Sequence, residues 1–172
     1  MASQFRKTQT RITPAKLAPD WFDQLLCGGA AMLFVALCIA VIRGQKDWPQ
    51  IPLAVWFHIG TVAIALVLTP VMLLRKRGDK WHRQLGWLWV TSMLVTAIIS
   101  LDIRLINRGS FSIIHLLSAS TLIQCAIILW SARSHNVARH RGAVRGMVLG
   151  ALLIAGFFTF PFDRLLGQWL FG

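Results

Sequence analysis

Apolar residues along this chain gather into five blocks that are separated by short polar and basic connections. The blocks cover residues 21–42, 51–74, 84–101, 111–132 and 146–162. A helix of about 20 apolar residues is long enough to cross a hydrocarbon core of roughly 30 Å. The pattern therefore predicts an all-α integral membrane bundle of about five transmembrane helices, of which the fifth is the shortest.

Composition also favours a membrane protein. Of the 172 residues, 56% are hydrophobic and 14% are charged, whereas about 25% of the residues in a soluble domain are charged. We expect residues 1–20, which are polar and basic, to form a cytoplasmic tail and residues 21–172 to form a single transmembrane domain. Cys27, Cys38 and Cys125 lie inside apolar blocks without a CxxC pair, which predicts small core residues rather than disulfides or a zinc site.

The basic residues are distributed unevenly between the two sides of the predicted bundle. Thirteen of the 18 Lys and Arg residues fall in the tail and in the 75–83 and 133–145 connections, and five fall on the other side. By the positive-inside rule the N-terminus is cytoplasmic and the C-terminus periplasmic, in a bacterial inner membrane. The net charge of +12 then points to anionic lipid headgroups rather than nucleic acid, because the charges lie between apolar spans.

Tryptophans mark the expected ends of the spans, since their amphipathic rings favour headgroup depth. Those expected near inner ends are Trp21, Trp81, Trp87, Trp89 and Trp130, and those near outer ends are Trp48, Trp56 and Trp169. Packing between helices is an equally good interpretation of Trp89.

Four of the five histidines form a repeat. His58 is followed, after 23 residues, by His82 and Arg83, and His115 is followed, after 24 residues, by His140 and Arg141. Helices two to five are therefore expected to form a four-helix core of two parallel hairpin repeats, related by an axis along the membrane normal. The remaining histidine, in the 133–145 connection, is interpreted as a loop residue.

The predicted orientation places these histidines at two depths. His58 and His115 lie about a third of the way in from outside, whereas His82 and His140 lie in the first turns of helices three and five. Capping by Asp79 and by Asn136 would carry those two helices beyond the lipid. Two neutral imidazoles facing each other suit bis-histidine ligation of haem iron, which predicts one or two b-type haems.

Other residues fit the haem hypothesis but also have simpler interpretations. Arg83, Arg141 or Arg145 on the inside, and Arg104 or Arg108 on the outside, could pair with haem propionates. Small residues that would admit a macrocycle are Gly60, Gly86 and the ladder Gly142, Gly146 and Gly150. The ladder equally suits helix packing. An outer histidine could instead bond a neighbouring carbonyl or Ser118, and an inner one could be an ordinary residue of a basic loop.

Two resemblances appear at these residues. The segments KRGDKWHRQLGWLWV, FSIIHLLS, ARHRGAVRG and FTFPFDRLLG resemble a bacterial family of small predicted membrane proteins whose function is uncharacterised. The histidine layout is similar to that of transmembrane dihaem b-type cytochromes, which implies an outer haem on His58 and His115 and an inner haem on His82 and His140. The chain lacks the substrate-side motifs of the ascorbate-dependent members.

The function expected from these observations is electron transport across the bilayer through one or two bis-histidine haems. Such a carrier could be a quinol- or reductant-linked oxidoreductase with quinone or a redox protein as partner, and Asp102 or Asp163 could accept protons from quinol. No nucleophile or acid–base pair is visible. The alternatives are a cofactor-free membrane scaffold or accessory subunit, and, less well supported, a small-solute transporter, since Pro70 is the one proline inside a span away from its ends.

Overall fold

The computed structural model describes residues 18–75, 77–102, 113–161 and 163–172, and within these ranges the secondary structure is entirely helical. Most of the predicted tail, the outer arginines Arg104 and Arg108, and the side chain of Asp102 lie outside the described residues.

Four of the described helices are long and apolar enough to cross a membrane. This finding confirms the prediction of an all-helical membrane protein. They are α1 (Trp21–Arg43), α2 (Leu53–Leu74), α3 (Lys80–Asp102) and α4 (Ile113–Arg133). A short 3₁₀ helix, η2 (Gly44–Gln50), continues α1. The third helix begins about one turn before the expected Gln84, because Asp79 caps it.

The fifth predicted span corresponds to a helical run in three parts. These are α5 (Val137–Met147), the π-helical segment η3 (Val148–Ile154) and α6 (Ala155–Phe157). The run begins well before the predicted Gly146 and ends before the predicted Phe162, which corrects both boundaries. The first turns of α5 contain basic residues, so the hydropathy pattern did not reveal where this helical run begins. After a turn at residues 158–161, the chain closes with α7 (Leu165–Phe171).

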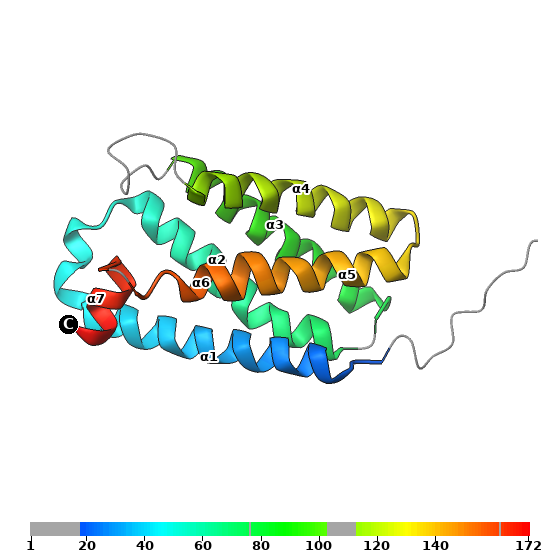
Figure 1. Cartoon of the computed structure of the whole chain (residues 1–172), viewed down its shortest axis with the longest axis horizontal. Helices are drawn as coiled ribbons and strands as arrows, with labels where there is room; N and C mark the ends of the chain where they lie inside the picture. Colours follow the sequence, from blue (N-terminus) through cyan, green and yellow to red (C-terminus); the bar gives the residue numbers. More distant parts are fainter. Residues whose placement is uncertain (1–17, 76, 103–112, 162) are drawn as a thin grey trace, which may run out of the picture.

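The helices lie side by side with their long axes aligned (Figure 1). Helix α3 packs between α2 and α4, α5 packs on α4, and η3 reaches back to α2, so these elements form a ring. Helix α1 lies outside the ring against α2 and η3. The predicted histidine pairs, one on α2 and α4 and the other on α3 and α5, therefore come from opposite helices of the ring.

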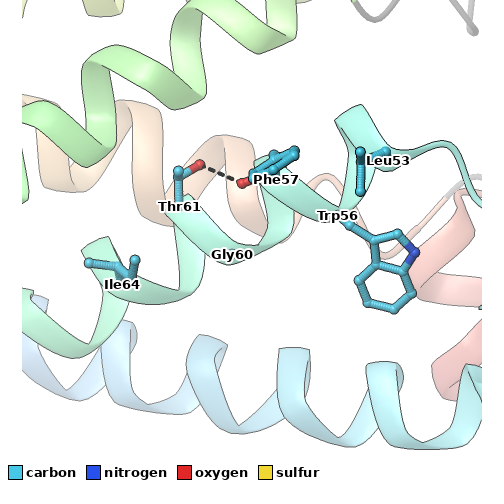
Figure 2. Close-up of a pocket in the computed structure, with 6 residues that line it drawn as sticks. All are labelled: Leu53, Trp56, Phe57, Gly60, Thr61 and Ile64. Atoms are coloured by element: carbon cyan, nitrogen blue, oxygen red, sulfur yellow. Dashed lines mark hydrogen bonds between the residues drawn. The ribbon is translucent and has the colours of Figure 1, made fainter.

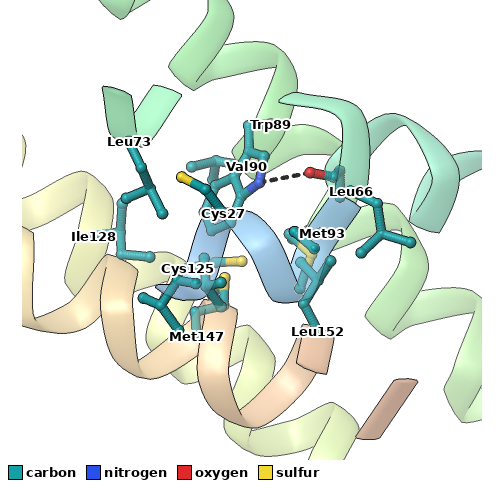
Figure 3. Packing of buried hydrophobic residues seen from close by; sticks show 14 of the residues in the cluster. Cys27, Leu66, Leu73, Trp89, Val90, Met93, Cys125, Ile128, Met147 and Leu152 are labelled. Carbon is teal, nitrogen blue, oxygen red and sulfur yellow. Dashed lines mark hydrogen bonds between the residues drawn. The ribbon is translucent and has the colours of Figure 1, made fainter. Parts of the chain in front are cut away.

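An apolar core fills the middle of the bundle (Figure 3). Its buried members include Leu66 and Leu73 of α2, Trp89, Val90 and Met93 of α3, Cys125 and Ile128 of α4, and Met147 and Leu152 of the fifth run. Close packing of these side chains against one another stabilises the association of the helices.

Helix α7 folds back over the end of the bundle at which α1 ends, beside η2 (Figure 1). The sequence predicts that this is the outer end. The indole N–H of Trp169 donates a hydrogen bond to Asp47 Oδ2 at 2.8 Å, and its ring stacks on Trp56, which in turn meets Trp48 edge to face. A Cβ atom on Gly44 would collide with the Trp169 ring, so glycine is needed where α7 docks. The three outer tryptophans thus gather at one end, as expected.

The inner tryptophans divide into two groups. Trp21, Trp81, Trp87 and Trp130 are more than half exposed. Trp89 is instead buried, and its indole donates to the Ala65 carbonyl oxygen at 3.2 Å and to Thr69 Oγ1 at 3.0 Å. Packing between α2 and α3 is therefore the correct interpretation of this residue. Two of the three cysteines are buried core residues and the third is partly buried.

Candidate functional site

The inner histidine of α3 is placed by a helix cap. Asp79 Oδ1 accepts a hydrogen bond from the backbone N–H of His82 at 2.6 Å, and Arg75 pairs with the other carboxylate oxygen at 3.0 Å. The hydrogen bond from His82, which has the largest effect, and the hydrogen bonds from Arg75 hold the pKa of Asp79 below its ordinary value. The cap was expected from the sequence and is confirmed. It fixes His82 in the first turn of α3.

The inner histidine of α5 is placed in the same manner. Asn136 Oδ1 accepts from the backbone N–H of Arg139 at 3.1 Å, which confirms the second expected cap. The imidazole of His140 then reaches α4, where Nδ1 lies 3.2 Å from the backbone carbonyl oxygen of Ile128. Because a carbonyl only accepts, Nδ1 must carry the proton and Nε2 is left with its lone pair.

His82 on α3 and His140 on α5 lie close enough to influence each other electrostatically, although α3 and α5 are opposite members of the ring. His82 Nδ1 is buried and makes no hydrogen bond to any described residue. A buried polar atom without a partner is uncommon in proteins and is one mark of a place for a ligand or ion.

The outer histidines occupy a more polar part of the bundle. His58 Nδ1 lies 3.1 Å from Ser100 Oγ on α3, and one turn deeper Thr61 and Thr96 share a hydrogen bond of 2.6 Å between their hydroxyl oxygens. His115 is buried on α4 with 7% of its surface exposed. The described contacts of His58 therefore run to the neighbouring helix α3, not across the ring to α4.

The arginines expected near the inner site have different surroundings. Arg83 is exposed in the first turn of α3. Arg141 pairs with Asp20 at 3.0 Å and with Asp23 at 2.8 Å, and Arg145 pairs with the same two carboxylates. Arg141 and Arg145 are thus already engaged by carboxylates of this chain.

Sequence reasoning missed Asp23, which is completely buried at the beginning of α1. Its carboxylate binds Arg77 as well as the two arginines of α5. With Asp20 it also forms a capping box, in which each side chain accepts from the other backbone N–H. The signal that could have found it was an acidic residue just inside an apolar block, since such residues need partners.

Glycines expected to admit a macrocycle or a neighbouring helix mostly face open space. Cβ atoms on Gly60, Gly142 or Gly150 would meet nothing within 4 Å, and one on Gly146 would meet only Gln124 at 3.7 Å. The Gly142–Gly150 ladder therefore does not mediate close helix packing in the described structure. Close packing occurs instead between α1 and the fifth run, where a Cβ atom on Gly156 would collide with the Leu33 side chain.

A shallow recess of about 300 Å³ surrounds Gly60 on α2, close in sequence to His58 (Figure 2). Its lining comes from α2 alone and is apolar except for Thr61, whose hydroxyl is already bonded to the carbonyl oxygens of Phe57 and His58. It therefore offers little polar recognition to a ligand.

The described residues contain no group of three or more His, Cys, Asp or Glu side chains that could hold a metal ion. A pair of histidines such as His82 and His140 falls below that number. Comparisons of the chain with protein-family models, with curated proteins and with solved structures found no match.

Proposed function

We propose that this protein is a membrane electron carrier that holds b-type haem between opposite helices of its ring. The observations that carry the proposal concern the inner pair: neutral His140 keeps Nε2 available for a ligand, and the buried Nδ1 of His82 bonds no described residue. A histidine that ligates a metal usually donates its other ring N–H to a carbonyl or hydroxyl oxygen. The bond from His140 to Ile128 has that form.

The outer pair, His58 and His115, would hold a second haem in the same proposal. The bond between His58 Nδ1 and Ser100 leaves Nε2 of His58 available when Nδ1 carries the proton. Haem, when bound, supplies reversible one-electron chemistry at its iron. The chain would orient the imidazoles, exclude water through the apolar core between the levels, and offer Arg83 on the inside to a propionate.

The topology that we propose has five transmembrane spans. We infer that the run α5–η3–α6 is a fifth span, because it lies beside the four long helices and α7 follows it at the outer end (Figure 1). Five spans put the N-terminus in the cytoplasm and the C-terminus in the periplasm of a bacterial inner membrane, in agreement with the distribution of Lys and Arg. The two hairpins α2–α3 and α4–α5 would be parallel repeats. Quinone or a redox protein would complete the electron path.

A cofactor-free scaffold is the second candidate, and one observation favours it. Both described histidine bonds, from His58 to Ser100 and from His140 to Ile128, join neighbouring helices and would stabilise a bundle without any ligand.

A difference spectrum distinguishes the two candidates. Protein purified in mild detergent from cells supplied with haem precursor should show b-type absorption bands in the reduced-minus-oxidised spectrum. A colourless protein would contradict the electron carrier and favour the scaffold.

A further inference from the structure

We propose that Asp23 is the positioning residue of the His82–His140 pair, an inference that rests on the function proposed for that pair. Asp23 acts through three arginines that belong to the two segments carrying these histidines. Without it, the beginning of α3 and the beginning of α5 would lose their common anchor on α1.

The anchor consists of three short ion pairs on one carboxylate. Arg77 Nη2 lies 2.7 Å and Arg141 Nη2 lies 2.8 Å from Asp23 Oδ2, while Arg145 Nε lies 2.8 Å from Oδ1. Asp23 has no exposed surface and the three guanidinium groups are mostly buried. Hydrogen bonds between ionised groups are strong and directional in such surroundings, so they fix the segments that carry them.

Short stretches of backbone link the anchor to both histidines. Arg77 precedes Gly78, whose φ of +86° turns the chain into Asp79, the residue that caps His82. On the other segment, Arg141 directly follows His140. A shift of Arg77 or Arg141 would therefore move the imidazole carried by the same segment.

The carboxylate itself is held still. Asp20 Oδ1 accepts from the N–H of Asp23 at 3.0 Å, and Asp23 Oδ2 accepts from the N–H of Asp20 at 3.2 Å. Asp20 also pairs with Arg145 at 2.5 Å, and this hydrogen bond lowers the pKa of Asp20. The capping box therefore fixes Asp23 in the first turn of α1, in addition to the ion pairs that Asp23 makes with the other two segments.

The cluster also sets the local charge. Two carboxylates face three guanidinium groups, which leaves an excess of one positive charge, and Asp23→Asn would raise that excess to two. Positive charge near a haem favours its reduced, less positive iron. We therefore expect Asp23→Asn to shift the midpoint potential of an inner haem upwards.

A cross-linking experiment tests the positioning role without haem. The parent protein would carry His82→Cys and His140→Cys, with the three native cysteines replaced by alanine. It should react with a short bifunctional thiol reagent to give one intramolecular bridge, measured by intact mass spectrometry. Asp23→Asn should lower the bridged fraction several-fold. Asp47→Asn, which removes a carboxylate at the opposite end of the bundle, should leave it unchanged.

Arg77→Met is the second variant for this cross-linking test, and it is used if Asp23→Asn does not give a monodisperse peak in detergent. It frees the segment before His82 while Asp23 keeps Arg141 and Arg145 as partners, and it should also lower the bridged fraction several-fold. A folded variant that bridges as fully as the parent would overturn the positioning role, as would a parent that does not bridge. Absence of haem from the natural protein, with the bridge still dependent on Asp23, would overturn the proposed function alone.

Discussion

His140 Nδ1 lies 3.2 Å from the backbone carbonyl oxygen of Ile128, a contact that joins α5 to α4 and fixes the imidazole tautomer. In the neutral imidazole, the same contact leaves Nε2 as the nitrogen that is available to a ligand. One hydrogen bond therefore connects helix packing to the proposed chemistry.

The first prediction concerns haem content. His58→Ala or His115→Ala should abolish the outer haem, and His82→Ala or His140→Ala should remove at most the inner one, because each haem needs both of its axial ligands. Pyridine haemochrome analysis per mole of purified protein measures the loss. His135→Ala changes a loop histidine between α4 and α5 and serves as the control. Full haem retention in the His58 and His115 variants would end the outer assignment.

The second prediction concerns topology. With five spans and a cytoplasmic N-terminus, alkaline phosphatase fused after Gly172 should be active and the same enzyme fused after Arg77 should be silent. A cytoplasmic reporter at the two positions should give the opposite result. An inactive phosphatase after Gly172, in a fusion of normal abundance, would mean that the α5–η3–α6 run does not cross the membrane.

The third prediction concerns stability at the inner end. Asp23→Ala leaves three guanidinium groups without their shared carboxylate, and removal of one partner from a buried ion pair costs about 3–5 kcal/mol in free energy of unfolding. Thermal unfolding in detergent should therefore begin at a clearly lower temperature. Asp163→Asn removes an exposed carboxylate at a position of positive φ that asparagine tolerates, and it should leave the unfolding temperature nearly unchanged. Equal unfolding temperatures for the two variants would contradict the buried cluster.

The fourth prediction concerns the docking of α7. Gly44→Ala places a methyl group against the Trp169 ring, so α7 should detach from the outer end and Trp169 should become accessible. Quenching of tryptophan fluorescence by a water-soluble quencher should increase. The control is Gly28→Ala on α1, where the added Cβ atom meets nothing within 4 Å. That control should not increase quenching.

The fifth prediction concerns the core. Trp89→Phe replaces the indole by a smaller phenyl ring and removes the N–H that bonds Ala65 and Thr69 of α2. The lost hydrogen bond should cost about 1 kcal/mol, because Thr69 keeps its own hydrogen bond to the Ala65 carbonyl oxygen and no buried group is stranded. The space left by the smaller ring adds to that cost. Trp87→Phe, at an exposed position on the same helix, should have little effect on thermal unfolding.

The sequence by itself determined the helical membrane class, because long apolar blocks can satisfy their backbone hydrogen bonds in lipid only as helices or closed barrels. Local chemistry was equally readable: Asp79 and Asn136 cap α3 and α5 as expected, since a cap involves residues only three positions apart. The fifth helix was harder, because its first turns are basic, so its hydropathy understates its length.

Only the tertiary structure decided which residues far apart in the chain meet. Asp23 and Arg145 are separated by 122 positions and lie 2.8 Å apart, and no local pattern relates them. The same holds for Trp89, whose place between α2 and α3 depends on how those helices rotate about their axes. Periodicity fixes the faces of a helix, but the partner of each face is selected by packing of the whole bundle.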